Sequence, residues 1–182
     1  MSRIGKKPLK IAAGVTLTQS AGSVVVKGPK GSLTLPLPSG IAVGVKDGVA
    51  TVTRTSEDKQ TRANHGTIRS ILENHIQGVT TPFMKSLEIQ GVGFQAAMKG
   101  KKLALKVGYA NEIQMDVPAG LEVTLPSTTK VVITGPDCQA VGEFAARVRK
   151  TRPPEPYNGK GIRYDGEHVE RKAGKTFTSS GG

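Results

Sequence analysis

Residues 38–43, PSGIAV, return as PAGLEV at residues 118–123, and this pair of segments decides the predicted fold. A second match keeps the same spacing, because Ile-Arg at residues 68–69 corresponds to Val-Arg at residues 148–149. The matches stay in order along the chain, which indicates an internal duplication. Two copies are fewer than the three or more that a solenoid requires, so we expect two similar domains.

Around PSGIAV, the first copy contains short β-branched runs and then one amphipathic stretch. The runs are separated by Gly and Pro, which predicts strands joined by tight turns: SVVVKG, SLTLPL, IAVGV and ATVTR. Apolar residues at helical spacing between positions 68 and 76 predict a helix. Thr55 or Ser56 is the expected cap of this helix, and Gly78 its expected end.

Around PAGLEV, the second copy repeats this order. The expected strands are SLEIQGVGFQAAM, KLALKVG, EIQMDV, LEVTL and KVVIT. Asp137 is then the expected cap of a second helix, which Pro153 and Pro154 end.

The sequence therefore predicts an α+β fold. It has two similar small domains, each a mostly antiparallel β-sheet packed against one main helix, and they are related by internal duplication. The expected parts are a basic N-terminal extension (1–8), an N-terminal α+β domain (9–81), a C-terminal α+β domain (82–167), and a polar C-terminal tail (168–182).

The charge balance predicts an anionic partner. The chain has 26 Lys and Arg against 14 Asp and Glu, a net charge of +12, and the excess is concentrated in residues 1–30, 99–106 and 147–182. Clustered cations suit a polyanion, because each one brought to a phosphate releases a counterion. Cys138 is the single cysteine, and no apolar run reaches the ~18 residues of a membrane helix. We expect a cytoplasmic protein without membrane contact.

Patterns typical of enzymes and metal sites are weak. GVGFQA at residues 91–96 satisfies a dinucleotide-binding pattern, but that pattern needs a helix directly after it, and the Lys-rich residues 99–102 follow instead. A bulge or a close backbone approach explains these glycines better. His65 and His75 are ten positions apart, too far to share an ion, so a structural or solvent-exposed role is expected. We predict no catalytic residue, metal, cofactor or small-molecule substrate, and no enzyme.

The segment PPEPYNGKGIRY, residues 153–164, fits neither a helix nor a strand. Its prolines stiffen the chain, and Gly159 and Gly161 leave room for a sugar-phosphate backbone. Lys160 and Arg163 can meet phosphates, while Tyr157 can stack on a base. The alternative is a Pro/Gly surface loop with incidental charges.

Basic residues cluster directly before this segment, at Arg147, Arg149, Lys150 and Arg152. One or two cations would suffice to complement the dipole of the helix, so four favour a phosphate-binding surface. Lysines at positions 99, 101 and 102 form a second cluster, for which RNA contact and protection of a sheet edge are equal alternatives.

Five stretches together resemble the family of bacterial large-subunit ribosomal protein six, and the similarity covers nearly the whole chain. They are SRIGKKPL (2–9), the PSGI and PAGL turns, GVGFQA (91–96) and PEPYNGKGIRY (154–164). The last stretch resembles the most specific signature of the family. It departs from that signature at Asn158, where the family usually has Lys.

The resemblance implies a structural protein of the large ribosomal subunit that supports subunit assembly and translation. It implies binding to 23S rRNA near the stalk base and the sarcin-ricin region, next to other large-subunit ribosomal proteins and bound translation factors. The family's RNA-contacting loop maps onto Tyr157, Gly159, Lys160, Gly161 and Arg163. Arg149, Lys150 and Arg152 are added by charge and position, and the secondary candidates are Arg3, Lys6, Lys7, Lys99, Lys101 and Lys102. A free-standing RNA chaperone and an enzyme that acts on RNA remain the alternatives.

Overall fold

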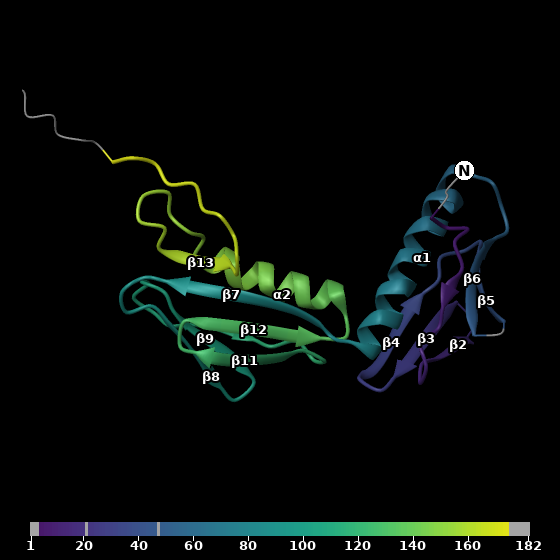
Figure 1. The fold of residues 1–182 in the computed structure, drawn as a ribbon, viewed down its shortest axis with the longest axis horizontal. Coiled ribbons are helices and arrows are strands. Elements are labelled where there is room, and N and C mark those ends of the chain that lie inside the picture. Colours follow the sequence, from purple (N-terminus) through teal and green to yellow (C-terminus); the bar gives the residue numbers. More distant parts are fainter. Residues whose placement is uncertain (1–3, 21, 47, 175–182) are drawn as a thin grey trace, which may run out of the picture. The chain divides into compact units, whose positions relative to one another are not determined.

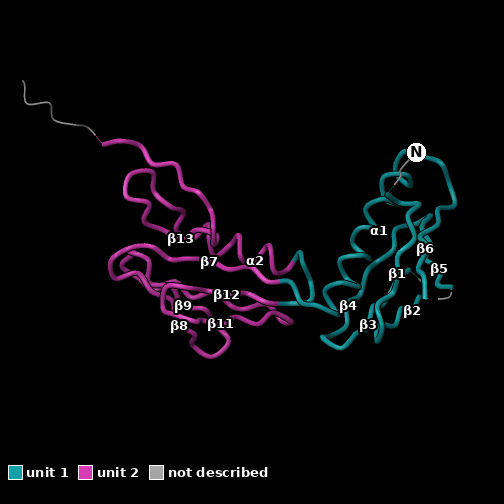
Figure 2. The backbone as a smooth tube through the Cα atoms, viewed as in Figure 1, with its two compact units in different colours: residues 1–83, 135–139 teal, residues 84–134, 140–182 magenta. Residues whose placement is uncertain are grey.

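The computed structural model describes residues 4–20, 22–46 and 48–174, and these residues form two compact units (Figures 1 and 2). Unit 1 takes its residues from 1–83 and 135–139, and unit 2 takes its residues from 84–134 and 140–182. The secondary candidate Arg3 lies outside the described residues. Both units combine antiparallel strands with one helix, which confirms the predicted α+β fold.

The described residues of the first half of the chain form six strands and one helix. They are β1 (Leu9–Lys10), β2 (Thr16–Ser20), β3 (Ser23–Gly28), β4 (Gly31–Pro36), β5 (Ile41–Lys46), β6 (Val49–Arg54) and α1 (Lys59–Thr80). The strands form two antiparallel three-stranded sheets, in the orders β2-β3-β4 and β1-β6-β5. The sequence analysis missed β1 and β2, since neither is a long β-branched run.

Helix α1 packs against strands of both sheets, β3, β4, β5 and β6. Its residues Ile68, Leu72 and Ile76 are buried at intervals of four, so they line one side of the helix. They join Val24 and Val26 of β3, which alternate with less buried residues as a strand with one buried face requires. The apolar core of unit 1 therefore comes from strands and helix together.

The predicted ends of α1 were wrong. Asp58 is the cap, with φ −64° and ψ 158°, and its carboxylate accepts a hydrogen bond of 2.9 Å from the Thr61 amide. Thr55 lies before the helix, where its amide donates to the Gly40 carbonyl oxygen, 3.0 Å away. The helix continues past Gly78 to Thr80. Gly78 is required by packing within unit 1, where a Cβ would lie 1.8 Å from the Pro136 carbonyl oxygen.

In the second half, the described residues up to 174 form seven strands and one helix. They are β7 (Phe83–Gln90), β8 (Gln95–Lys99), β9 (Lys102–Lys106), β10 (Ile113–Asp116), β11 (Glu122–Ser127), β12 (Lys130–Gly135), α2 (Cys138–Thr151) and β13 (Gly161–Tyr164). The sheet orders are β10-β9-β8 and β11-β12-β7-β13. As predicted, the Asp137 carboxylate accepts from a helix amide, that of Gln139 at 2.9 Å, and α2 ends before Pro153.

Unit 2 has its own apolar core. Figure 1 shows α2 running along the sheet that contains β7 and β12. Phe144 and Val148 of α2 are buried, as are Leu87 and Ile89 of β7 and Ile162 of β13. The last two are direct partners in the β7-β13 ladder. No helix in the described part of the chain is long and apolar enough to span a membrane.

Two predictions in the second copy were wrong. The expected single strand SLEIQGVGFQAAM is two strands, β7 and β8, with a turn at residues 91–94 in which the Phe94 amide donates to the Gly91 carbonyl oxygen at 3.2 Å. Gly91 and Gly108 make room for the Phe94 ring, which a Cβ at either position would approach within 2.8 Å. A strand follows this turn, so the dinucleotide-binding pattern lacks its helix. The second error is in PPEPYNGKGIRY, whose last four residues form β13.

Candidate nucleic-acid interface

Residues 153–160, which we call the basic loop, connect α2 to β13 in unit 2. The loop closes on itself, because the Glu155 amide donates to the Lys160 carbonyl oxygen at 3.0 Å and the Gly159 amide to the Glu155 carbonyl oxygen at 3.1 Å. Its two ends are joined by the Ile162 amide, which donates to the Arg152 carbonyl oxygen at 2.7 Å. These bonds fix the backbone of a segment that is neither helix nor strand, so its side chains are presented in defined directions.

The tip of the basic loop is exposed. Tyr157 has 57% of its surface accessible, and Asn158 and Lys160 are also exposed. The Lys160 side chain has no hydrogen bond or ion pair among residues 4–20, 22–46 and 48–174. An exposed cation beside an exposed aromatic ring, on a fixed backbone, can contact a phosphate and a base of one nucleic acid.

The two glycines of the basic segment have structural roles that the sequence analysis did not foresee. Gly161 has φ +146°, and a Cβ there would lie 2.6 Å from the Pro153 carbonyl oxygen and 2.7 Å from the Pro154 Cα. Gly159 has φ +71°, and a Cβ there would lie 3.0 Å from Nη2 of Arg171. The missing Cβ of Gly161 is needed for the loop to pack on its own backbone, and that of Gly159 lets the Arg171 side chain lie close to the loop.

Arg163 of β13 is held by a carboxylate. It lies directly opposite Glu88 of β7, and its Nη2 and Nε donate to Oε2 of Glu88 at 2.9 and 3.2 Å. Both side chains are partly exposed, at 24% and 32%. An arginine has five N–H donors, so this side-on pair leaves the Nη1 edge available for a second acceptor.

Arg149, in the last turn of α2, is held in the same way by Glu167. Its Nε donates to Oε2 of Glu167 at 2.9 Å, and its Nη2 donates to Oε1. Glu167 also accepts from the Tyr164 amide at 2.9 Å, and the Arg149 guanidinium lies 5.7 Å from the centre of the Tyr164 ring. The hydrogen bonds from Arg149 are the main reason why the pKa of Glu167 lies below its usual value.

The remaining cations of this cluster are Arg147, whose Nη2 pairs with Oε1 of Glu143, Lys150 and Arg152. Lys150 is exposed, and the Arg152 guanidinium lies 5.2 Å from the centre of the Tyr109 ring. The Tyr109 hydroxyl donates to the Thr151 carbonyl oxygen at 3.0 Å. This hydrogen bond satisfies one of the carbonyl groups at the C-terminal end of α2 that have no partner within the helix. The structure thus brings the basic loop, the end of α2 and β13 together within one unit.

The secondary candidates divide into two groups. Lys99 and Lys102 of unit 2 form ion pairs with Glu112 at 2.5 Å and with Asp116 at 3.2 Å. In the described part of the chain no ion pair involves Lys101, which is exposed. Lys6 and Lys7 belong to unit 1, where they are exposed. Acidic residues therefore already balance two of the three lysine charges at positions 99, 101 and 102.

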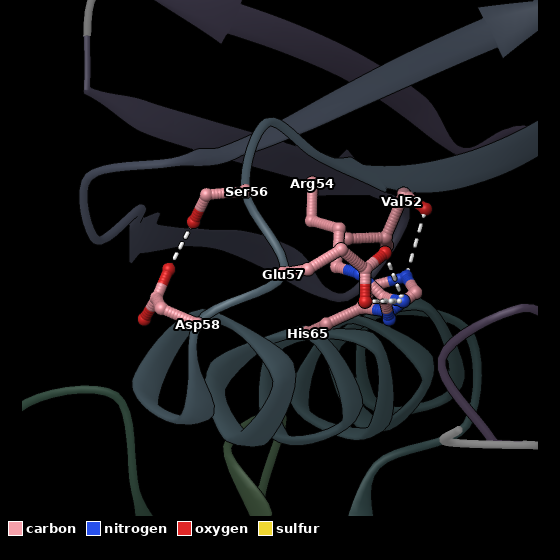
Figure 3. A network of polar contacts seen from close by, with 6 residues as sticks. All are labelled: Val52, Arg54, Ser56, Glu57, Asp58 and His65. Atoms are coloured by element: carbon pink, nitrogen blue, oxygen red, sulfur yellow. Dashed lines mark hydrogen bonds and ion pairs between the residues drawn. The ribbon is translucent and has the colours of Figure 1, made fainter.

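His65 and His75 are structural, as one of the two predicted alternatives stated, whereas His168 is exposed. His65 is 4% exposed; its Nε2 donates to the Val52 carbonyl oxygen at 3.0 Å, and Nη1 of Arg54 donates to its Nδ1 at 3.2 Å (Figure 3). Arg54 also pairs with Glu57, at 2.6 Å. His75 is 7% exposed, and burial lowers its pKa. Across the described ranges, no three His, Cys, Asp or Glu side chains gather as a metal site would need.

Sequence reasoning missed Glu88, Glu167 and Tyr109. Glu88 is 75 positions from Arg163, and Glu167 is 18 positions from Arg149. No local spacing signals either pair, since Glu88 becomes a neighbour of Arg163 only when β7 pairs with β13, and Glu167 meets Arg149 only when the turn after β13 packs against α2.

Comparison with known proteins points to one family. The sequence model of ribosomal protein L6 matches residues 11–81 and 90–165, one match in each copy of the duplication. A protein named large ribosomal subunit protein uL6 from Bacillus cereus (strain ZK / E33L) is 52% identical over 177 residues, which cover 97% of this chain and 99% of the relative. Proteins of the same name from Moorella thermoacetica and Rubrobacter xylanophilus are 49% and 47% identical, over 100% and 96% of this chain and 99% of each relative.

Proposed function

This chain belongs to the ribosomal protein L6 family, and from that premise we propose that it binds 23S rRNA as a structural constituent of the large subunit. Membership confirms the prediction of a ribosomal protein and not an enzyme. A member of this family works in the cytoplasm, where ribosomes translate. Its role is to hold segments of RNA in position relative to one another and so to support subunit assembly and translation.

One observation carries the RNA-binding part of the proposal. The basic loop has a fixed backbone, yet it presents Lys160 and Tyr157 to solvent, and it follows directly in the chain after Lys150 and Arg152 at the end of α2. Phosphates are met by exposed cations, and rigid presentation lowers the entropy lost on binding. Gly159, Gly161, Arg149 and Arg163 belong to the same proposed surface, the glycines by shaping the loop and the arginines through their free N–H groups.

Neighbouring large-subunit proteins are further proposed partners. We place the RNA site near the stalk base and the sarcin-ricin region, where translation factors bind, because the similarity to the family extends over 97% of the chain. Among the secondary candidates, exposed Lys101 is the best placed for a second RNA contact, since Lys99 and Lys102 have acidic partners.

Fractionation of a cell extract on a sucrose gradient tests membership of the subunit. We expect the protein at one copy per large subunit, retained through washes of moderate salt. A protein that sediments free of ribosomes and binds unrelated structured RNAs as tightly as 23S rRNA would be a free-standing chaperone, and the proposal would be wrong.

Replacement of Lys160 tests the basic loop. Lys160→Ala removes one phosphate contact, so the slope of log affinity for 23S rRNA against log salt should become shallower by about 0.7–0.9. Lys160 is the best probe, because changing Arg163 would also leave Glu88 without its partner. The measurement is filter binding to protein-free 23S rRNA over a series of salt concentrations.

Lys46→Ala is the matched control, since Lys46 is an exposed lysine of β5 in unit 1. It should leave the slope as in the wild type. Equal slopes for Lys160→Ala and wild type would remove the basic loop from the RNA-binding surface.

A further inference from the structure

A hollow of about 460 Å³ lies where the chain turns back after β13. Five residues line it: Arg163, Glu167, His168, Val169 and Arg171. We propose that this hollow binds one phosphate group of the RNA backbone, with Arg171 as its main cation. The proposal rests on the RNA binding proposed above and adds a subsite outside the basic loop. Three of its residues, His168, Val169 and Arg171, lie in the segment predicted only as a polar tail.

The chain segment that forms the outer wall is held in place. We call residues 165–172 the return segment. The Glu167 amide donates to the Tyr164 carbonyl oxygen at 3.0 Å, and the Glu167 carboxylate is fixed by Arg149. At the other end, the Lys172 amide donates to the Pro156 carbonyl oxygen at 2.7 Å. Because the return segment is attached at both ends, the side chains between them face a defined hollow.

Gly159 of the basic loop contributes to the position of Arg171. A Cβ on residue 159 would lie 3.0 Å from Nη2 and 3.1 Å from Nε of Arg171, closer than a side chain can normally approach. The guanidinium therefore lies against the bare backbone of the loop. One glycine thus allows the Arg171 guanidinium of the return segment to lie against the loop.

The charges in the hollow favour an anion. Its one carboxylate, Glu167, already accepts hydrogen bonds from Arg149 and from the Tyr164 amide. Arg163 is balanced by Glu88 but retains its Nη1 donors. Arg171 is exposed, and none of the ion pairs among the described residues involves it. The guanidinium of Arg171, which has no acidic partner in the described part of the chain, and that of Arg163, which has free donors, can therefore bind one phosphate together.

An RNA phosphate fits the hollow better than a free anion does. His168 and Arg171 are exposed, so solvent would screen a single small anion strongly. A phosphodiester gains from its neighbours along the chain, which can contact Lys160 in the basic loop and Lys172, whose amide is bonded to that loop. The hollow then extends the proposed surface along the RNA backbone.

Two substitutions of Arg171 in the full-length protein test the subsite. Arg171→Gln removes the charge, and we expect the salt slope for 23S rRNA to become shallower by about 0.7–0.9, equivalent to roughly threefold less loss of affinity between about 50 and 200 mM salt. Arg171→Lys keeps the charge but loses the planar fork, so it should weaken binding while the slope stays as in the wild type. Arg62→Gln, at an exposed position of α1 in unit 1, is the matched control and should change neither quantity.

The outcomes separate this proposal from the one on which it rests. A wild-type protein that binds 23S rRNA without salt dependence would end both proposals. A normal wild-type slope that Arg171→Gln leaves unchanged would overturn the subsite alone. A slope lowered equally by Arg171→Gln and Arg171→Lys would show a conformational effect and also overturn it. Titration with inorganic phosphate, followed by NMR of the arginine side chains, is the last arm: saturable binding that Arg171→Gln abolishes without changing the RNA slope would make the hollow a free-anion site.

Discussion

Two glycines of unit 2, Gly161 and Gly142, differ in the space available for a side chain. Gly161 adopts φ +146° with three backbone atoms within 2.8 Å of where a Cβ would be. Gly142 lies within α2, and the space where its Cβ would be is open to 4 Å. The same added methyl group therefore meets backbone at one position and nothing at the other.

Replacement by alanine should separate the two glycines. Gly161→Ala should lower the free energy of unfolding by at least about 1–3 kcal/mol, the usual cost of a strained backbone conformation, with the steric clash in addition. Gly142→Ala should raise it by about 0.5–1 kcal/mol, since alanine is the better residue inside a helix. Urea unfolding followed by circular dichroism measures both. If the two variants were equally stable, the role assigned to Gly161 in closing the basic loop would be wrong.

Helix α2, strand β13 and the return segment are joined by one ion pair. Arg149 leaves the last turn of α2, Glu167 follows β13, and their exposed fractions are 31% and 24%. Because Glu167 also accepts from the Tyr164 amide, the pair holds the turn after β13 against the helix. A partly exposed pair of this kind contributes about 0.5–1 kcal/mol, so its main effect is local.

This pair predicts a pH dependence. The pKa of Glu167 is lowered in the folded protein from its ordinary value of 4.5, mainly by the hydrogen bonds from Arg149. A lowered pKa means that the stabilising effect is fully present above about pH 4.5 and is lost as the pH falls through the folded value. Glu167→Gln should therefore reduce the free energy of unfolding at pH 7 and have a smaller effect near pH 3.

Urea unfolding at both pH values checks this prediction, and hydrogen exchange of the Lys172 amide gives a local measure. We expect faster exchange in Glu167→Gln at pH 7, because the return segment then loses its contact with Arg149. A stability difference that grew as the pH fell would contradict the assigned sign.

At the scale of the whole molecule, the two units have separate cores. Leu72 of α1 is 0% exposed within the core of unit 1, and Leu103 of β9 is 0% exposed within unit 2. The proposed RNA surface, formed by the basic loop and its neighbours, lies in unit 2. Damage to the core of unit 1 should therefore leave the structure of that surface largely intact.

Leu72→Ala tests this separation. Loss of a buried leucine side chain costs about 2–5 kcal/mol, so amides of unit 1 should exchange faster in Leu72→Ala. Amides of β12 and β13 should keep their protection, and the salt slope for 23S rRNA should not change. Leu103→Ala is the reciprocal control, with faster exchange in unit 2. Loss of protection in both units from either variant would mean that the chain unfolds as one cooperative body.

Local patterns in the sequence predicted most of the fold. Alternating β-branched runs predicted β3 to β6, and the helical spacing of apolar residues predicted both helices. Both kinds of pattern depend only on residues that are close together in the sequence. Strand β13 was missed because a four-residue strand that begins with glycine has no such pattern. The cap of α1 was misplaced by two or three residues, because Ser56 and Asp58 are both good capping residues and only the backbone course after β6 selects between them.

Some features of the candidate site could likewise be predicted from the sequence, and others depend on the tertiary structure. By itself, the sequence determined the duplication, the order of strands and helices, and the concentration of cations after α2, because each of these depends on residue type and near neighbours. Only the tertiary structure decided which cations have acidic partners, why Gly159 and Gly161 lack a side chain, and that Arg171 lies beside the basic loop. Those features depend on contacts between residues far apart in the chain, such as Glu88 and Arg163, which become neighbours only when β13 pairs with β7.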